Sequence, residues 1–220
     1  MKAFLFDFDG TLVFLRTNYL RMKLRLFWMF CRYGIISAFS PLLDSIENSL
    51  HKLERKGYPV SFLEEIRHKA YNIVSSEEVS AVKKARLVPG AEELLSLLRQ
   101  NEIAIAVISK NGTHCIQACI DKLNVLEPDL IISRDDVHFE ELKPSPVQVA
   151  RAIDKLRLSR EEVVIIGDSP DDIQAGRNLD IYTILVNRNK GYRNAGLAPD
   201  WTVPDLYHII NNYRLLNRSS

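Results

Sequence analysis

Two carboxylates near the N-terminus, Asp7 and Asp9, are the first residues whose spacing suggests chemistry. They come at the end of an apolar run that predicts a buried strand over residues 3–8. Side chains at i and i+2 of an extended segment point to the same side, so the two carboxylates are held together. Gly10 allows a ligand to approach the backbone, and Thr11 offers a hydroxyl. A nucleophilic carboxylate beside a proton-shuttling one suits phosphoryl transfer, although Asp-Gly turns and calcium loops share this composition.

The chain after this strand first shows only helical patterns and then alternates between strands and helices. The predicted helices of the first region cover residues 18–33, 41–56, 60–74 and 76–86, and we find no strand candidate there. Pro89-Gly90 breaks the pattern. Beyond it, apolar runs predict strands over 103–108, 130–132, 163–166 and 181–186. Helical segments cover 91–100, 113–123, 146–156 (with Ser145 as its N-cap), 171–178 and 204–212, and the tail 217–220 is expected to fray.

This alternation predicts an α/β fold. Continuously apolar strands that alternate with helices indicate a parallel sheet covered on both faces, here a doubly wound sheet. The all-helical region follows the first strand directly. We therefore expect a core domain of residues 1–14 and 87–220, with a helical domain of residues 15–86 inserted after the first strand.

Further polar residues follow the later strands, where ligands bind in doubly wound sheets. Ser109, Lys110 and Asn111 come directly after one apolar run and can offer a hydroxyl and backbone N–H groups to an anion. The same residues are also common in ordinary turns. Asp168 and Asp172 follow another run and suit a hard divalent cation. Capping of the next helix by Asp168 or Ser169 is the competing explanation.

Lys143 stands before a proline, between a predicted strand and the helix that begins near Pro146. A lysine in such a position is usually solvated. Here its ammonium could reach the same edge of the sheet. Each of the four signals has a simpler explanation, but their joint occurrence, in this order along the chain, favours a reaction centre.

The four segments together resemble the motifs of the haloacid dehalogenase (HAD) superfamily of aspartate-based phosphotransferases. The segment Asp7-Phe8-Asp9-Gly10-Thr11 is similar to the first motif and Ser109 to the second. Lys143-Pro144 is similar to the third motif and Gly167–Asp172 to the fourth. The place of the helical insert resembles the cap of the subclass that contains phosphoglycolate phosphatase and β-phosphoglucomutase. The motifs cover about two thirds of the chain, because the cap matches only in position and helical character.

The resemblance implies a role for each residue. Asp7 would attack phosphorus and form an aspartyl-phosphate, and Asp9 would act as general acid and then as general base. The resemblance also implies Mg²⁺, bound by the Asp7 and Asp168 carboxylates and the backbone carbonyl of Asp9, with Asp172 supporting the site. Phosphate oxygens would be held by a group comprising Gly10, Thr11, Ser109, Lys110, Asn111 and Lys143. Lys143 would in addition offset the negative charge of the nucleophile and the phosphate.

Two departures and two alternatives concern the reaction. Val13-Phe14-Leu15 stands where many relatives have Asp-Ser, and Lys110 stands where many have Asn. Lys110 is either an extra phosphate contact or a solvated residue. Asp9 argues against a true dehalogenase, which needs no proton donor there. A phosphomutase would use the same core residues, but Gly167-Asp168 is more similar to the phosphatases than the Glu-Asp of many mutases. We therefore expect a phosphatase for a small phosphorylated metabolite.

Composition limits the other classes of function. The chain has 220 residues and a formal net charge of +1, which gives little support to nucleic-acid binding. Three cysteines argue against a disulfide framework, and Cys115 and Cys119 are expected to be small core residues.

The charges are distributed unevenly along the chain. Residues 13–86 contain thirteen Lys/Arg and seven Asp/Glu, whereas the remainder contains sixteen Lys/Arg and twenty-one Asp/Glu. This asymmetry suggests two modules that together handle an anion. A monomer and a homodimer are both compatible with the sequence.

The segment 18–33 suggests a function of another class, a protein that binds a membrane surface. It mixes basic and aromatic residues, and no acidic residue lies between Val13 and Leu43. We favour the simpler interpretation, in which its apolar residues form the core of the cap or a dimer contact. Basic residues such as Arg16, Arg21 and Arg25 could recognise a carboxylate or a second phosphate. The N-terminus has no secretory pattern, so a cytoplasmic location is expected.

Overall fold

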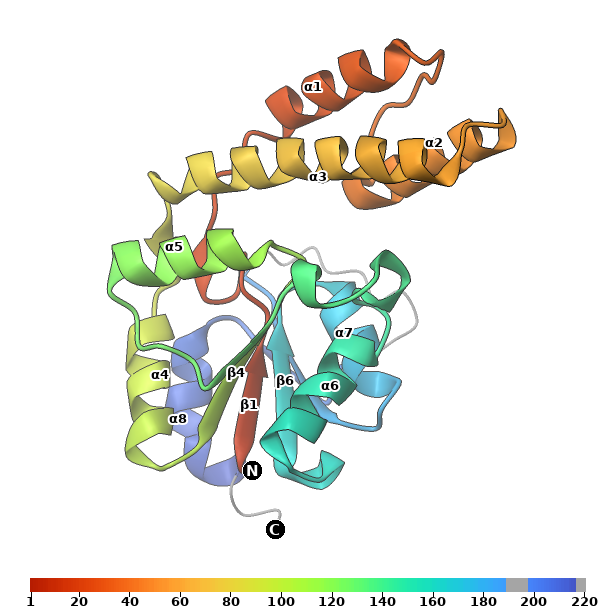
Figure 1. Ribbon diagram of the computed structural model, residues 1–220. Coiled ribbons are helices and arrows are strands. Elements are labelled where there is room, and N and C mark those ends of the chain that lie inside the picture. The colour runs from red at the N-terminus through yellow and green to blue at the C-terminus, as the bar shows by residue number, and fades with distance from the viewer. Residues whose placement is uncertain (189–197, 217–220) are drawn as a thin grey trace. The chain divides into compact units, whose positions relative to one another are not determined.

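The computed structural model describes residues 1–188 and 198–216. The chain divides into two compact units (Figure 1). The core unit comprises Met1–Leu15 and Lys84–Ser220, and the helical unit comprises Arg16–Lys83. Sequence analysis placed the same two boundaries at residues 14/15 and 86/87. The predicted tail 217–220 lies outside the described residues.

The core unit is built on a six-stranded parallel sheet with the strand order β5-β4-β1-β6-β7-β8. The strands are β1 (Ala3–Phe6), β4 (Ala104–Ile108), β5 (Leu130–Ile132), β6 (Val163–Gly167), β7 (Tyr182–Val186) and β8 (Trp201–Val203). All four residues of β1 are buried, because β1 pairs with β4 on one side and with β6 on the other. Strands enclosed in this way are continuously apolar, and the α/β prediction is confirmed.

Helices cover both faces of this sheet. Figure 1 shows α4 (Ala91–Gln100) and α8 (Leu206–Leu216) on one face, and α6 (Val147–Leu156) and α7 (Pro170–Arg177) on the other. The core unit also contains α5 (Thr113–Leu123), in which Cys115 and Cys119 are buried as expected. The described residues of this unit also form three short 3-10 helices: η1 (Arg134–Asp136), η2 (Phe139–Glu141) and η3 (Arg160–Glu162). The doubly wound arrangement is the one that the sequence predicts.

The sheet and helices of the core unit differ from the prediction in some details. Strand β8 was missed, because only three residues separate Asp200 from Pro204. Its position is fixed by the Asp200 carboxylate, which accepts hydrogen bonds from the backbone N–H and the hydroxyl of Thr183 in β7. Helix α6 begins at Val147 with Pro146, not Ser145, at the N-cap. Helix α8 begins two residues later than predicted and is longer.

The helical unit consists of α1 (Tyr19–Cys31), α2 (Leu42–Arg55) and α3 (Val60–Val82). Its core is apolar, and α1 contributes Met22, Leu26 and Phe30 to it. The prediction of two helices over 60–74 and 76–86 was wrong, because α3 runs through Ser75-Ser76 without a break. The Ser76 hydroxyl donates to the carbonyl oxygen of Ile73, so the serine is satisfied inside the helix and need not end it.

A short two-stranded ribbon was also missed. Strand β2 (Val13–Phe14) pairs antiparallel with β3 (Arg86–Leu87). These residues lie where the chain leaves the core unit and where it returns. Two residues per strand are too few to give an alternating pattern, and the second strand falls at the end of a segment with helical character.

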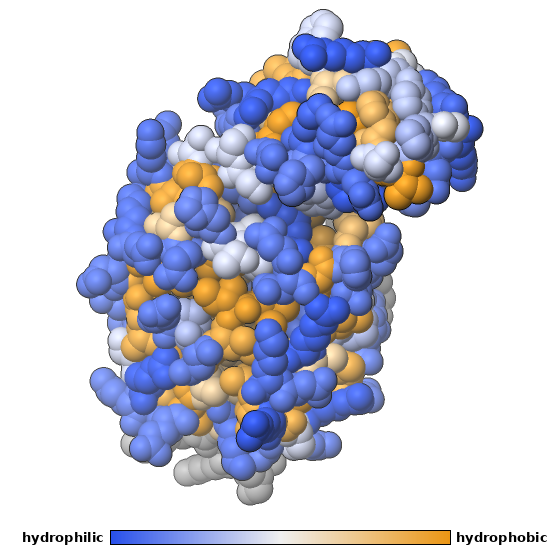
Figure 2. All heavy atoms as spheres, in the orientation of Figure 1, coloured by the Kyte–Doolittle hydropathy of each residue, from blue (hydrophilic) through white to orange (hydrophobic). Residues whose placement is uncertain are grey.

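Helix α1 leaves part of its apolar surface exposed. Leu20, Leu24 and Trp28 follow one another at helical spacing and are each at least 50% exposed. Figure 2 shows hydrophobic residues of the helical unit at the surface, among hydrophilic ones. Arg21 and Arg25 of the same helix pair with the buried Glu77 of α3. None of the described helices combines the length and the apolar character needed to cross a membrane.

Candidate active site

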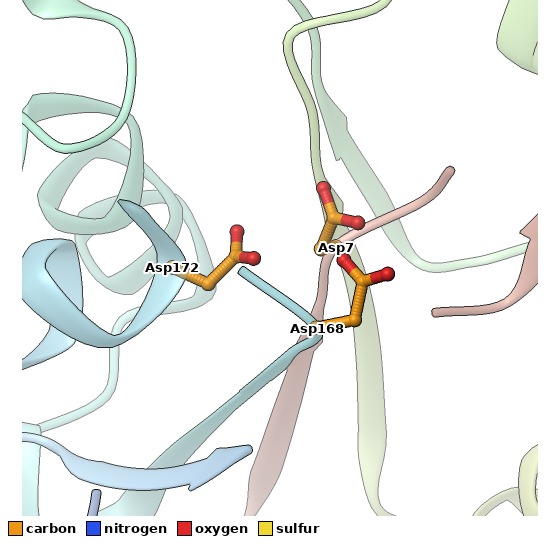
Figure 3. A group of neighbouring side chains, drawn as sticks. All are labelled: Asp7, Asp168 and Asp172. Carbon is orange, nitrogen blue, oxygen red and sulfur yellow. The ribbon is translucent and has the colours of Figure 1, made fainter. Parts of the chain in front are cut away.

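The predicted site residues of the core unit gather at the carboxyl edge of its sheet. Asp7 follows β1 directly, Ser109 follows β4, and Asp168 follows β6. Neighbouring parallel strands end side by side, so residues far apart in sequence come together there. Figure 3 shows Asp7, Asp168 and Asp172 converging from the ends of β1 and β6 and from α7. One carboxylate oxygen from each of the three lies within 4.8 Å of the others.

Lys143 joins two of these carboxylates. Its Nζ donates to Oδ1 of Asp7 at 2.7 Å, to Oδ1 of Asp172 at 2.6 Å and to the carbonyl oxygen of Ile108 at 2.7 Å. All three donor positions of the ammonium are therefore used. The side chains of Lys143 and Asp172 are 2% and 1% exposed, and that of Asp7 is 13% exposed. The ion pairs thus lie in the interior, where charge interactions are strong.

Burial and charge act together on the acidity of the cluster. Burial raises the pKa of Asp7 to about 7; the Lys143 ammonium opposes this rise, and Asp172 and Asp168 add to it. Burial lowers the pKa of Lys143, but the Asp172 and Asp7 carboxylates outweigh this effect and hold it above the ordinary lysine value. Desolvation, with Asp172 next, raises the pKa of Asp168. The Lys143 ammonium is therefore stabilised by the two carboxylates that it contacts, those of Asp7 and Asp172.

The donor set fits a hard divalent cation. Both oxygens of Asp172 already have partners: Oδ1 accepts from Lys143, and Oδ2 accepts from the hydroxyl of Ser169 at 2.6 Å and from its backbone N–H at 3.1 Å. Asp168 is exposed and the Asp7 side chain is 13% exposed, whereas that of Asp172 is 1% exposed, so Asp7 and Asp168 are the carboxylates that an ion could reach. Mg²⁺ is commonly bound by one or two carboxylates together with water. Ser169 and Asp172 also cap α7, so the capping explanation holds for this pair.

Asp9 and Thr11 are held by the first loop. Oδ1 of Asp9 accepts a hydrogen bond from the backbone N–H of Leu15 at 2.9 Å. The hydroxyl of Thr11 is buried and donates to Oδ2 of Asp7 at 3.3 Å. Thr11 therefore orients the candidate nucleophile in this structure, and its contact with phosphate stays a prediction.

Gly10 is a position of this loop where no side chain fits. Its φ is +95°, and a Cβ atom there would lie 2.1 Å from Oδ2 of Asp168. The loop after β1 and the loop after β6 are thus in direct contact at Gly10. A residue with a side chain at position 10 would therefore displace the Asp168 carboxylate.

The loop after β4 carries Ser109, Lys110 and Asn111. The hydroxyl of Ser109 is buried; it donates to Oδ1 of Asn111 and accepts from the backbone N–H of the same residue, both at 3.1 Å. Nζ of Lys110 pairs with Oδ2 of Asp171 at 2.5 Å, so Lys110 is not simply solvated in this structure. A phosphate contact of any of the three residues stays a prediction.

Two residues near the site were not predicted. Arg188 lies just beyond β7, and its Nη2 donates to the carbonyl oxygen of Gly10. Its guanidinium carbon lies 5.0 Å from the centroid of the Phe14 ring, and its Nη1 is buried without a hydrogen-bond partner among the described residues. The strand-end rule that found Ser109 would also have found Arg188.

Gln148 is the second such residue. It lies on α6 and is completely buried. The signal in the sequence was a polar residue at a position that shares a helix face with the apolar Ala152. Its contacts reach both the loop of Ser109 and the backbone of Lys143.

Comparisons with known proteins agree on one family. The family model described as "Haloacid dehalogenase-like hydrolase" matches residues 4–186. The chain is 27% identical over 217 residues to a haloacid dehalogenase-like hydrolase domain-containing protein of Arabidopsis thaliana, covering 96% of this chain and 83% of that protein. It is 24% identical over 221 residues to the pyrophosphatase PpaX of Halalkalibacterium halodurans, covering 96% and 97%.

A solved structure shows the same fold. The crystal structure of a predicted phosphoglycolate phosphatase from Haemophilus somnus superposes with a TM-score of 0.68 at 18% identity. The match covers 97% of this chain and 98% of that one. The likeness therefore extends beyond the sheet to nearly the whole length of the chain.

Proposed function

Because the chain belongs to the haloacid dehalogenase-like hydrolase family, we propose that it is a magnesium-dependent phosphatase that hydrolyses a small phosphorylated metabolite through an aspartyl-phosphate. The family match confirms the resemblance inferred from the four motifs and indicates that the chain is a hydrolase. The relatives named pyrophosphatase favour a phosphoryl group as the group transferred. A cytoplasmic location and a monomeric or homodimeric state stay predictions.

The observation that carries the proposal is the bridge that Lys143 forms between Asp7 and Asp172 beside Asp168. A buried ammonium that touches the candidate nucleophile keeps its carboxylate oriented and offsets its charge. Without such compensation, a phosphate dianion would be repelled by three carboxylates. The cluster can therefore bind an anionic substrate only if positive charges, such as that of Lys143, lie beside the three carboxylates.

The first step would transfer the phosphoryl group to Asp7. A carboxylate oxygen of Asp7 donates an electron pair to phosphorus, and the bond from phosphorus to the leaving-group oxygen breaks. Asp9, in its acid form, gives its proton to that oxygen. Help of this kind from a positioned acid is commonly worth about 10²–10⁴-fold.

The second step would release phosphate. Asp9, now a carboxylate, takes a proton from a water molecule, whose oxygen forms a bond to phosphorus. The bond between phosphorus and the Asp7 oxygen breaks, and the Asp7 carboxylate is regenerated. The hydrogen bond from Leu15 would hold Asp9 in the loop between these steps. Ser109 and the N–H groups after it would bind the phosphate oxygens, and Lys143 would offset their charge.

The Asp7 and Asp168 carboxylates and the backbone carbonyl of Asp9 would hold Mg²⁺, with Asp172 supporting them. When bound, the ion would supply positive charge opposite the transferred phosphoryl group.

The proposal is tested by phosphate release from p-nitrophenyl phosphate and from a panel of sugar phosphates, phosphoglycolate and pyrophosphate. We expect release with Mg²⁺ and no release with EDTA. Asp168→Asn should raise the Mg²⁺ concentration needed for half-maximal activity at least about 10-fold, because one of the two accessible carboxylates is lost. Asp154→Asn, an exposed change on α6, serves as the control. Lack of phosphate release from every compound in the panel would contradict the proposal.

Gly10 gives a second prediction at this site. Gly10→Ala should lower kcat/KM about 10²-fold or more, because its Cβ would displace the Asp168 carboxylate. Gly57→Ala is the matched control: Gly57 also has a positive φ, +86°, but nothing lies within 4 Å of its Cβ position. Both variants carry the backbone strain of a left-handed residue, so both should lose thermal stability. Equal activity of the two variants would show that contact with Asp168 is unimportant.

A further inference from the structure

Gln148 connects two parts of the candidate site that are distant in sequence. Its Nε2 lies within hydrogen-bonding distance of three carbonyl oxygens, which share its two hydrogens: those of Ser109 at 3.0 Å, Ser133 at 3.1 Å and Ile132 at 3.4 Å. Its Oε1 accepts from the backbone N–H of Lys143 at 3.2 Å. A single amide on α6 therefore joins the loop after β4, the end of β5 and the segment that carries Lys143.

The contact with Ser109 determines the direction of the next peptide group. A trans peptide is planar, so the carbonyl of Ser109 and the N–H of Lys110 point in opposite directions. Because Gln148 holds this carbonyl toward α6, the N–H of Lys110 is turned away from α6. The side chain of Arg134 holds the following carbonyl, that of Lys110, at 2.9 Å. Gln148 and Arg134 therefore orient two successive peptide groups of the loop that would bind phosphate.

The contact with Lys143 holds the backbone from which its side chain extends to Asp7. Lys143 is 2% exposed, and its ammonium satisfies three acceptors at 2.6–2.7 Å. Keeping all three contacts at these distances requires the backbone of Lys143 to hold its position. Gln148 is completely buried, so bulk water cannot take over its hydrogen bond with the backbone N–H of Lys143.

We propose that Gln148 is a positioning residue that holds the Ser109 loop and Lys143 in one arrangement, and that it acts on catalysis through them. The inference rests on the proposed phosphatase function. A merely structural role would predict a loss of folding stability alone, since buried amides that lose their partners are costly wherever they lie.

The test compares Gln148→Met with Thr183→Val. Thr183 is also completely buried, and its hydroxyl exchanges hydrogen bonds with Asp200 away from the site. Both changes remove buried hydrogen bonds, so both should lower the melting temperature. Only Gln148→Met should lower kcat/KM for p-nitrophenyl phosphate, by about 10- to 100-fold. Equal kcat/KM in the two variants at matched fractions folded would overturn the proposal.

Gln148→Glu adds a readout that a structural role would not change. A protonated carboxyl group can donate to Ser109 and accept from Lys143, as the amide does, whereas a carboxylate can only accept. Burial raises the pKa of a carboxyl group placed there. The activity of Gln148→Glu relative to the native protein at the same pH should therefore rise as the pH falls from 8 to 5. A constant ratio across this range would contradict the proposed donor role toward Ser109.

Amide hydrogen exchange separates failure of this inference from failure of the proposed function. Gln148→Met should speed exchange of the backbone N–H of Lys143, whereas Thr183→Val should leave it unchanged. This measurement requires neither substrate nor metal. If the native protein releases no phosphate, the proposed function fails while exchange still decides whether Gln148 holds Lys143. Unchanged exchange in Gln148→Met would overturn the positioning role.

Discussion

Asp7→Asn should lower phosphate release by at least about 10⁴-fold, the largest loss expected from any single change in this chain. An amide oxygen is a far weaker nucleophile than a carboxylate, and covalent catalysis depends on that nucleophile. The amide oxygen can still accept from Lys143, which contacts Oδ1 of Asp7 at 2.7 Å, and the NH2 group in the place of Oδ2 can donate to the Thr11 hydroxyl. The variant should therefore fold normally. Single-turnover phosphate release with Mg²⁺ measures the effect.

The same variant should be more stable than the native protein when metal is absent and the pH is above 7. The pKa of Asp7 is raised to about 7 in the folded state from an ordinary value near 4. A carboxyl group with a raised pKa loses protons more readily when the chain unfolds, so its contribution to stability is lost as the pH rises from about 4 to 7. The Asp7→Asn variant does not lose stability in this way, because an amide does not ionise between pH 4 and 7. The melting temperature at pH 8 in EDTA should rise by about 2 °C or more.

Asp121→Asn is the control for both measurements. Asp121 is an exposed acidic residue on α5 that accepts from Gln117, so its replacement should leave phosphate release unchanged and give no gain in melting temperature at pH 8. The gain of Asp7→Asn should disappear below pH 4, where the native carboxyl group is protonated in both states. A native-like rate for Asp7→Asn would exclude Asp7 as the nucleophile. A gain in melting temperature that is independent of pH would contradict the raised pKa.

The gathering of the site residues could be predicted because it depends on one rule. Apolar runs such as 163–166 mark buried parallel strands, and the residues after each run must meet at one edge of the sheet. Asp7, Ser109 and Asp168 follow from this rule directly. The order of the strands did not have to be known. Arg188 follows β7 and obeys the same rule, although it was not among the predicted site residues.

Other features depend on tertiary contacts that leave little trace in the sequence. The ribbon of β2 and β3 and the strand β8 are two or three residues long, so they have no measurable period. Helix α3 continues through two serines because hydrogen bonds to its own backbone satisfy Ser76. The role of Gln148 depends on four partners from three segments, and only its place among apolar residues was visible.

The bridge formed by Lys143 leads to the prediction with the second largest effect. Lys143→Met should reduce kcat/KM about 10²–10³-fold, comparable with the loss of a group that stabilises charge in a transition state. It should also lower the free energy of unfolding by about 3–5 kcal/mol, the usual cost of removing one partner from a buried ion pair. Urea unfolding at pH 7 measures the second effect.

The stability loss should depend on pH in a direction that follows from the carboxylates. The pKa of Lys143 is raised, so the lysine stays charged and contributes to stability throughout the neutral range. Burial and the Asp172 carboxylate raise the pKa of Asp7, and the Lys143 ammonium opposes this rise. Lys143→Met removes the ammonium, so the pKa of Asp7 rises further. Asp7 then favours unfolding more strongly as it ionises. The difference in stability between Lys143→Met and the native protein should be larger at pH 8 than at pH 5.

A second substitution keeps this prediction testable if Lys143→Met folds poorly. Asp172→Asn in the Lys143→Met background removes one of the two buried charges, while its side-chain oxygen can still accept from Ser169. The double variant should therefore regain part of the lost stability without regaining activity. Lys69→Met is the control, because Lys69 pairs with Glu65 at the surface, where such pairs contribute little. Equal stability losses for Lys143→Met and Lys69→Met would show that the bridge is not a buried ion pair.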